Sequence, residues 1–278
     1  MRRIPEEKVR QLVEKVLAFY VQNGRHDLPW RKTVDPYAIL VSEIMLQQTQ
    51  VARVVPKYEV FLRRFPTVHF LAAADLADVL RLWQGLGYNR RAKYLHEAAK
   101  EVVARWNGVF PNTCADLQTL SGVGLYTAGA VCAFAYDTPV AMVETNIRTV
   151  VIYECFPKKQ HVEDVAVHGV MLQALRYVSS PRVWYWACMD YGSALKSSGV
   201  VVHRQSAHHS KQAPFAGSDR QVRGAIVRAI AHSSKSVSIA ELQKALDISA
   251  EKEIIAAQCT ALKKDGLLRQ NASGKWFL

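Results

Sequence analysis

Cysteines are few in this sequence, and they are widely spaced. The 278 residues contain five of them and no Cys-x-x-Cys pair. Zinc and iron–sulphur sites usually bring their ligands together at short spacings. We therefore expect buried, reduced thiols and no metal or cluster held by cysteine. The five are Cys114, Cys132, Cys155, Cys188 and Cys259.

Long apolar stretches are also missing. No run reaches the roughly 18 consecutive apolar residues that a membrane-spanning helix needs. Residues 1–7 are charged and lead into an amphipathic stretch, which differs from a signal peptide. The sequence therefore predicts a cytoplasmic protein, associated with the nucleoid if it is prokaryotic, with no membrane partner.

Acidic residues are in deficit. The chain has 24 of them against 36 lysines and arginines, which gives a formal net charge of +12 at pH 7. A chain this basic favours a polyanionic partner, most commonly nucleic acid, and an anionic membrane surface is the alternative. Half of the residues are hydrophobic, so the chain can bury a sizeable core.

Alternating strand patterns are nearly absent from the first two-thirds of the chain. Apolar residues at helical spacing predict a helix over residues 9–23, and residues 24–36 contain the glycine and prolines of a loop. From there to about residue 195 the pattern is helix, short turn, helix, and prolines such as Pro56 and Pro66 separate the helices. Residues 1–196 are therefore expected to form an all-α domain.

The composition changes after Lys196. Residues 197–217 are polar and basic and lack helical periodicity. They predict an exposed loop that faces DNA through Arg204 and Lys211, and a solvated linker is the simpler alternative.

A second, smaller unit is expected over residues 218–278. Three helices and a terminal hairpin are the outline of a winged-helix-like domain, a type that binds DNA or another protein. Ser238 and Ser249 are the expected N-caps of its second and third helices. The elements are predicted over residues 219–232, 238–246 and 249–264 for the helices and 267–278 for the hairpin, with its turn at 271–274.

Two glycines mark the most specific short motif, residues 120–129. A helix ends near Thr119, Gly122 and Gly124 allow a tight turn, and Thr127 opens the next helix. Backbone N–H groups at such a turn can bind a DNA phosphate without reading the sequence. An ordinary connection between helices is the alternative. The segment resembles the helix-hairpin-helix of DNA repair glycosylases.

One carboxylate lies within an apolar helix. Residues 39–46 are apolar on nearly every face, which predicts burial, and Glu43 is among them. Burial raises the pKa of a carboxyl group, as a general acid near neutral pH requires. A structural ion pair with an arginine is the alternative. Gln47 and Gln48 follow, either to fill the gap that a flipped base leaves in DNA or simply as solvated side chains.

A second carboxylate follows another apolar run. Glu144 and Asn146 stand where residues 140–151 lead into a helix. Removal of a base from deoxyribose develops positive charge on the sugar, which a nearby carboxylate stabilises or attacks. Capping of the helix by Glu144 is the alternative.

Together, segments within residues 8–196 resemble the adenine DNA glycosylases of MutY type, in the endonuclease III superfamily. So many matches in one order are very unlikely by chance. They are Leu28-Pro-Trp-Arg31, Asp35-Pro-Tyr37, Ser42-Glu-Ile-Met-Leu-Gln-Gln-Thr-Gln-Val51, Phe65-Pro-Thr67, Gly85-Leu-Gly-Tyr-Asn-Arg-Arg-Ala92, Leu95-His96, the hairpin and Met189-Asp-Tyr-Gly192.

The resemblance implies roles for several residues. Glu43 matches the general acid that protonates the departing adenine, and Asn146 matches an active-site asparagine. Tyr126 matches an active-site tyrosine and stands where bifunctional relatives carry a lysine nucleophile, which implies a monofunctional enzyme. The matched DNA contacts are Gln47 and Tyr88, which enter the duplex near the lesion, and Arg31 and Gln48, in segments near the target or opposite base.

Three departures from the family pattern matter. Glu144 replaces an aspartate, so that the carboxylate is displaced by one methylene. The four iron–sulphur cysteines of the family are missing, with Lys196 at the first ligand position, which implies a branch without the cluster. The family's C-terminal domain, which inspects 8-oxoguanine, is replaced by the winged-helix-like domain.

The sequence thus predicts a two-lobed helix-hairpin-helix DNA glycosylase fold with a small C-terminal winged-helix-like domain. The expected reaction is hydrolysis of the N-glycosidic bond of a flipped base in double-stranded DNA, namely adenine mispaired with 8-oxoguanine or guanine. The alternatives are thymine or uracil opposite guanine, a damaged purine, or a non-catalytic repair factor. We expect a monomer without cofactor, except for a cation at the backbone carbonyls of Leu120 and Val123.

Overall fold

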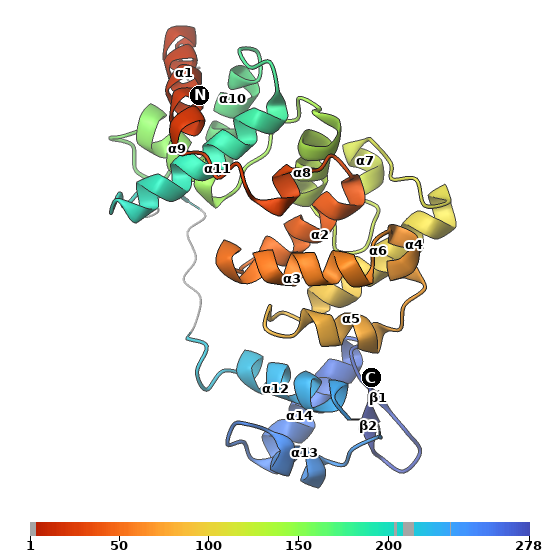
Figure 1. The fold of residues 1–278 in the computed structure, drawn as a ribbon. Helices are drawn as coiled ribbons and strands as arrows, with labels where there is room; N and C mark the ends of the chain where they lie inside the picture. Colours follow the sequence, from red (N-terminus) through yellow and green to blue (C-terminus); the bar gives the residue numbers. More distant parts are fainter. Residues whose placement is uncertain (1–3, 203–204, 208–213, 234) are drawn as a thin grey trace. The chain divides into compact units, whose positions relative to one another are not determined.

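The computed structural model describes residues 4–202, 205–207, 214–233 and 235–278. Their regular secondary structure is almost entirely helical, which confirms the all-α prediction (Figure 1). The strands named within them are β1 (Arg269–Gln270) and β2 (Trp276–Phe277), which pair with each other. The chain divides into two compact units, each assembled from segments that are distant in the sequence.

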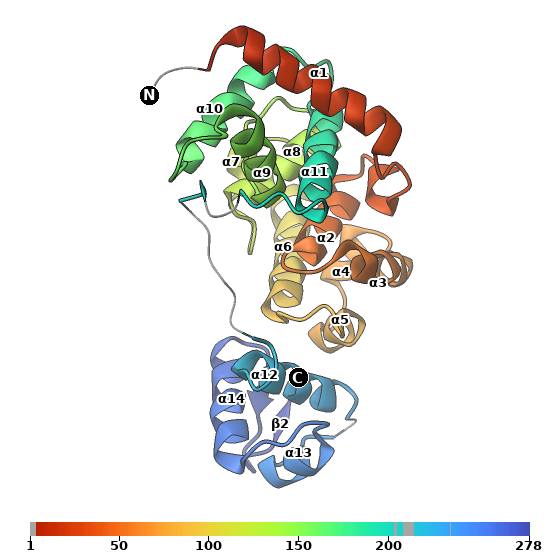
Figure 2. The same ribbon diagram turned by 90° about the vertical axis from the view of Figure 1, so that its left-hand side faces the viewer.

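Unit 1 comprises residues 1–40, 111–119 and 123–211. Its helix α11 packs against α1, α8 and α9 (Figures 1 and 2). Trp184 and Tyr185 of α11 are fully buried, and the Tyr185 hydroxyl donates a hydrogen bond to the carbonyl oxygen of Val140 across 2.6 Å. The helices are α1 (Glu6–Asn23), η1 (Pro29–Arg31), α7 (Cys114–Leu117), α8 (Leu125–Tyr136), α9 (Thr145–Cys155), α10 (Asp164–Ala174) and α11 (Pro181–Ser197).

Unit 2 comprises residues 41–110, 120–122 and 212–278. In its first part, α6 packs against α4 and α5. The ring of Phe61 lies 5.1 Å from that of Phe65 and 6.1 Å from that of Trp83. Helix α2 (Pro36–Leu46) begins in unit 1 and ends in unit 2, and it is followed by α3 (Val51–Arg64), α4 (Val68–Ala72), α5 (Leu76–Trp83) and α6 (Arg90–Trp106).

The proline at position 56 does not separate two helices. Pro56 lies inside α3, which continues from Val51 to Arg64, so the predicted break there was wrong. A proline removes one backbone hydrogen bond from a helix. Here the burial of Val54, Tyr58 and Phe61 on one face keeps the helix intact around it.

The C-terminal module, residues 218–278, has the predicted three helices and hairpin. Helices α12 (Asp219–Ala231) and α13 (Ile239–Ala245) pack against α14 (Lys252–Lys264). Val237 and Trp276 exchange backbone hydrogen bonds of 2.8 and 2.9 Å, which adds a bridge beside the β1–β2 hairpin.

Of the two predicted caps in the C-terminal module, one is confirmed. Ser238 forms a capping box with Glu241 at the start of α13. The predicted cap at Ser249 was wrong, because α14 begins at Lys252 after Glu251.

Part of the predicted linker is tied to unit 1. The N–H of Val162 donates to the carbonyl oxygen of Gln205 across 2.6 Å, and the N–H of Ala207 donates to that of Val162 across 3.1 Å. Val162 therefore forms a parallel bridge with Ser206. Residues 205–207 belong to the folded unit rather than to a solvated linker. Among the described residues, no helix is long and apolar enough to cross a membrane.

Candidate active site and nucleic-acid interface

Helix α2 carries Glu43 into a buried position. The helix starts after Asp35, whose carboxylate accepts hydrogen bonds from the N–H groups of Tyr37 (3.1 Å) and Ala38 (3.3 Å). Glu43 follows within the same helix and is only 6% exposed, which confirms its predicted burial. A buried carboxylate is costly unless it is paired or protonated, so its place in an apolar helix needs a reason beyond packing.

The buried guanidinium of Arg91 holds the end of α2, where the two predicted DNA-contacting glutamines stand. Its Nη1 donates to the carbonyl oxygens of Ile44 (2.7 Å) and Met45 (3.1 Å), and also to that of Gln47. A cation at this end of a helix satisfies carbonyl groups that have no partner within the helix. Gln48 follows with a φ of 56°, a left-handed conformation that surrounding contacts must maintain.

The other terminal nitrogen of Arg91 holds the loop before α6. Nη2 donates to the carbonyl oxygens of Leu86 (2.9 Å) and Gly87 (3.0 Å) and to the hydroxyl of Thr49 (3.1 Å). Tyr88 comes next, also left-handed, with a φ of 49°. Burial lowers the pKa of Arg91 to about 10, which leaves it charged at neutral pH. One side chain thus fixes both segments that were predicted to enter the duplex.

The side chain of Tyr88 lies between two arginines. The guanidinium carbon of Arg91 is 5.5 Å from the centre of its ring, and that of Arg220, on α12, is 5.8 Å away. Arg220 also donates a hydrogen bond to the Tyr88 hydroxyl across 2.7 Å. The residue is 39% exposed. A partly exposed ring on a fixed backbone is suited to stack on a base.

The first half of the predicted hairpin packs on α6. The carboxylate of Glu101 accepts hydrogen bonds from the N–H (2.8 Å) and the hydroxyl (2.6 Å) of Ser121. Gly122 has a φ of 73°, and a Cβ added to it would lie 2.6 Å from the Cβ of Tyr94. Glycine is therefore required at this position both by the backbone conformation and by the close packing.

Gly124 is different. Its φ of −87° suits any residue, and an added Cβ would meet no atom within 4 Å. The backbone conformation does not require glycine here, but the absence of a side chain leaves the space beside the turn open. No side chain caps α8 at this end, and the next residue, Leu125, is 76% exposed. Thr127 is only 4% exposed, so a phosphate contact here would use the backbone of the first turn.

Glu144 caps α9 with one carboxylate oxygen and contacts Asn146 with the other. Its Oε1 accepts a hydrogen bond from the N–H of Ile147 across 2.7 Å, and its Oε2 accepts one from Nδ2 of Asn146 across 3.3 Å. Burial raises the pKa of Glu144, although the backbone N–H groups of Asn146 and Ile147 and the nearby charges of Lys196 and Arg148 act against the rise. The two interpretations of this residue are thus compatible.

The structure places the four predicted catalytic residues on three helices. Glu144 and Asn146 meet at the start of α9 in unit 1. Tyr126, also in unit 1, is the second residue of α8 and is partly exposed. Glu43 lies in the part of α2 that belongs to unit 2.

Two further predictions stay predictions. Arg204 and Lys211, the expected phosphate contacts, lie outside the described residues. Leu120 and Val123, whose carbonyls were expected to hold a cation, have buried side chains on either side of the hairpin turn.

The predicted DNA contact of Arg31 finds no support in its surroundings. Its side chain is 3% exposed and pairs with the buried carboxylate of Asp190 through hydrogen bonds of 2.7 and 2.9 Å. Its guanidinium carbon also lies within 6 Å of the rings of Tyr20 (5.7 Å) and Trp186 (5.6 Å). Arg31 is an internal ion-pair partner because Asp190, distant in sequence, folds against it.

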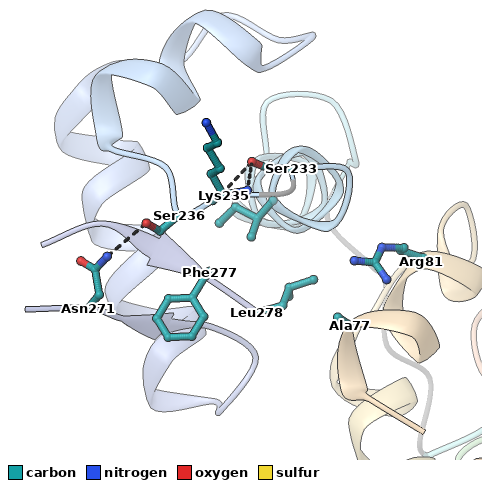
Figure 3. A pocket seen from close by; sticks show the side chains of 9 residues that line it. Ala77, Arg81, Ser233, Lys235, Ser236, Asn271, Phe277 and Leu278 are labelled. Carbon is teal, nitrogen blue, oxygen red and sulfur yellow. Dashed lines mark hydrogen bonds between the residues drawn. The ribbon is translucent and has the colours of Figure 1, made fainter. Parts of the chain in front are cut away.

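A pocket of about 410 Å³ lies in unit 2, away from all these residues (Figure 3). Arg81 and Ala77 of α5 line one side, and the last residues of the chain, Phe277 and Leu278, line the other. Arg81 also donates a hydrogen bond to the carbonyl oxygen of Ala231 across 2.7 Å. None of the predicted catalytic residues lines this pocket, so we do not assign the reaction to it.

Residues 41–176 match the HhH-GPD superfamily of base excision DNA repair proteins. The chain is 34% identical to the adenine DNA glycosylase of Mycolicibacterium smegmatis, over 95% of this chain and 94% of that protein. The adenine DNA glycosylase of Mycobacterium tuberculosis is also 34% identical, over 99% of this chain and 97% of that protein. The chain belongs to the adenine DNA glycosylase family.

Solved structures of DNA glycosylases share the fold of this chain. A thermostable thymine-DNA glycosylase has 26% identity and a TM-score of 0.60, over 67% of this chain and 87% of that one. An endonuclease III trapped on DNA has 17% identity and a TM-score of 0.53, over 78% of this chain and 94% of that one, and so supports the fold alone. The mycobacterial relatives align over at least 95% of the chain, beyond residues 8–196, on which the sequence resemblance rested.

The residues present do not fit an iron–sulphur cluster of the kind that belongs to the family pattern. Lys196, at the first ligand position, offers an ammonium group, which has no lone pair to give a metal. Four of the five cysteines are buried. Burial raises the pKa of Cys132 to about 12 and that of Cys155 to about 11, which disfavours the thiolate that a metal ligand needs. No group of three or more histidine, cysteine or acidic side chains suited to a metal occurs among the described residues.

The sequence analysis did not identify the structural roles of two residues, Arg91 and Asp190. Arg91 stands in a matched motif, but its role depends on backbone carbonyls that no sequence pattern encodes. Asp190, also in a matched motif, is the partner that turns Arg31 inward. For Arg91, the sequence indicated only that an arginine stands in a helical, partly apolar stretch.

Proposed function

We propose that the protein hydrolyses the N-glycosidic bond of adenine mispaired with 8-oxoguanine or guanine, as a monomer on double-stranded DNA. The observation that carries this proposal is the buried Glu43 in a chain that aligns with adenine DNA glycosylases over nearly its whole length. A protein that only binds DNA has no need of a buried acid. The proposal that the base opposite adenine is 8-oxoguanine rests on the family resemblance.

The chemistry follows from the two carboxyl groups. Glu43, as general acid, gives a proton to the base, which leaves with the electron pair of the glycosidic bond. Positive charge then develops on the sugar, and the carboxylate of Glu144 stabilises it. Water adds to C1′ of the sugar and releases a proton to a carboxylate of the site, which leaves an abasic site.

The enzyme is monofunctional. Tyr126 stands at the position of the lysine nucleophile in bifunctional relatives, and a phenol cannot form a Schiff base with the sugar. Strand cleavage is therefore not part of the reaction.

The enzyme also works without an iron–sulphur cluster. Support comes from Lys196 at the first ligand position and from the burial of the remaining thiols. Protein purified without oxygen is expected to lack stoichiometric iron and sulphide and to show no cluster absorbance near ~400 nm. Stoichiometric iron and sulphide would refute this part of the proposal.

The test is a panel of duplexes under single-turnover conditions, treated with alkali after incubation. It contains adenine opposite 8-oxoguanine and opposite guanine, thymine and uracil opposite guanine, and a damaged purine. The expected result is cleavage at adenine in the first two. Cleavage only at another base would change the substrate, and no cleavage in any duplex would leave a non-catalytic repair factor.

A further inference from the structure

Helix α11 approaches the start of α9 more closely than any side chain at the crossing would allow. A Cβ added to Gly192 would lie 2.5 Å from the carbonyl oxygen and 2.8 Å from the Cβ of Asn146. Lys196 follows four residues later in α11, which places it on the same helix face, one turn further on. The close crossing at Gly192 therefore brings the lysine to Asn146.

A chain of hydrogen bonds joins this lysine to the catalytic carboxylate. Nζ of Lys196 donates to Oδ1 of Asn146 across 2.8 Å. Because the carbonyl side of the amide faces the ammonium, its NH₂ side faces Glu144 and donates to Oε2 across 3.3 Å. The other oxygen of Glu144 is held by the N–H of Ile147.

Within the part of the chain that the structure describes, the other charged and titratable groups near Glu144 are already engaged or neutral. Arg148, on α9, is paired with Asp164 of α10 through hydrogen bonds of 2.6 and 2.8 Å. Cys188, on α11, is buried, and burial raises its pKa well above the ordinary value, so it stays a neutral thiol. Lys196 is thus the cation whose hydrogen bond leads to Glu144. Its side chain is exposed, where a single hydrogen bond adds little net stability, so its effect is on orientation.

Two departures from the family pattern meet at Asn146. Glu144 is one methylene longer than the aspartate of the family, and Lys196 stands where the family has a cluster ligand. A longer side chain has one more rotatable bond and needs one more restraint to reach a defined position. The Lys196–Asn146 bond supplies that restraint.

We propose that Lys196 is a positioning residue for base excision, which orients Asn146 and through it the carboxylate of Glu144. This inference rests on the proposed function, and it adds a residue that neither the fold nor the family pattern provides.

The test compares Lys196→Met with Lys196→Arg in single-turnover excision at saturating enzyme, on adenine opposite 8-oxoguanine. The methionine variant is expected to be roughly 10- to 100-fold slower, because the carboxylate loses its position. The arginine variant, which can still donate to Oδ1, is expected to recover much of the rate. Lys158→Met removes the same charge from an exposed loop of unit 1 and should excise at the wild-type rate.

The pH dependence of the excision rate distinguishes a positioning role of Lys196 from a role in overall stability. Loss of a nearby cation makes ionisation of Glu144 harder, so the acidic limb of the rate profile should move to higher pH in Lys196→Met. Thermal unfolding should change little, since the lysine is exposed. A wild-type rate with an unchanged profile would overturn the proposal. So would a variant that loses only duplex affinity, because Lys196 would then be a phosphate contact.

The role of Lys196 can also be tested without measuring catalysis, which separates it from the proposed function. The side-chain amide of Asn146, observed by ¹⁵N NMR in the full chain, should shift in Lys196→Met and stay in place in Lys158→Met. If wild-type protein cut no duplex but the amide shifted, the proposed function would be wrong and the network would stand. An amide unmoved by Lys196→Met would overturn the network itself.

Discussion

The guanidinium of Arg220 donates a hydrogen bond to the hydroxyl of Tyr88 across 2.7 Å. This contact joins α12 of the C-terminal module to the loop before α6, within unit 2. Tyr88 is matched to a residue that enters the duplex. The module therefore contacts the element that is expected to probe DNA, and it does so through an arginine, a residue type that commonly binds phosphate.

The first prediction concerns this arginine. Arg220→Met should weaken duplex binding severalfold and lower the slope of log affinity against log salt by about one, the value for one lost phosphate contact. Fluorescence anisotropy over a series of salt concentrations measures both. Arg228→Met, on the same helix and paired with Asp247 at the surface, is the matched control. An unchanged slope would remove Arg220 from the DNA interface.

The second prediction concerns Glu43. Glu43→Gln should abolish excision and leave duplex affinity nearly intact, because the amide keeps the shape of the side chain but is not an acid. Single-turnover kinetics and anisotropy on the same duplex measure the two effects. Excision near the wild-type rate in this variant would rule out Glu43 as general acid.

The third prediction concerns Arg91. Lysine has three donors on one nitrogen and cannot reach both the end of α2 and the loop before α6, so Arg91→Lys should leave buried carbonyls without partners. We expect a loss of about 2–4 kcal/mol in the free energy of unfolding, at roughly 1–3 kcal/mol for each orphaned group. Denaturant titration measures it, and Arg90→Met, at the exposed neighbouring position, is the control. Equal stability of the two variants would contradict the role of Arg91.

The fourth prediction concerns the pH dependence of stability at Asp190. Burial alone would raise the pKa of this carboxyl, but the hydrogen bonds and charges of Arg31 and Arg25 hold it below its ordinary value. In the unfolded protein the pKa of an aspartate is about 3.9. Because the pKa of Asp190 is lower in the folded protein, its ionisation stabilises the fold at pH values above about 3.9. That stabilisation is lost as the pH falls through the pKa of the folded protein. Asp190→Asn should therefore cost about 3–5 kcal/mol at pH 7, since it leaves Arg31 buried and unpaired. Denaturant titrations should show a smaller difference in unfolding free energy between wild type and variant below about pH 4. A difference that stays constant with pH would show that the charge of Asp190 does not stabilise the fold.

The fifth prediction concerns covalent chemistry. Borohydride should trap no major adduct between the protein and DNA during excision, because Tyr126 replaces the lysine nucleophile. Gel analysis of the reduced reaction measures this. Efficient trapping that disappears when one particular lysine is replaced would reveal a nucleophile, and Lys196→Met is the first variant to examine.

The sequence predicts those parts of the site that depend on local pattern. Glu43 is buried because the residues around it on the helix are apolar. Glu144 and Asn146 meet because a cap and the second residue of a helix are always close. Gly122 was predicted from the need for a tight turn, which its positive φ confirms. The cytoplasmic location and the monomeric state stay predictions.

The parts that escaped prediction depend on partners distant in the chain. Arg31 was expected to contact DNA, but its side chain is buried against Asp190, which lies 159 residues away in the sequence. Arg91 donates hydrogen bonds to backbone carbonyl oxygens. Every residue has such a group, so the sequence does not indicate which of them Arg91 contacts. Lys196 and Asn146 are 50 residues apart and meet only where two helices cross at a glycine.

The short bridge between Val162 and Ser206 decides where this protein can be divided for separate expression of its parts. A chain ended at residue 196 would remove the carbonyl of Gln205 and the N–H of Ala207, to which the backbone of Val162 is bonded. Val162 itself is fully buried, so its backbone groups would be left without partners in the interior. A chain ended after residue 207 keeps both bonds. The catalytic part should therefore be soluble and stable in the longer form and prone to aggregation in the shorter one.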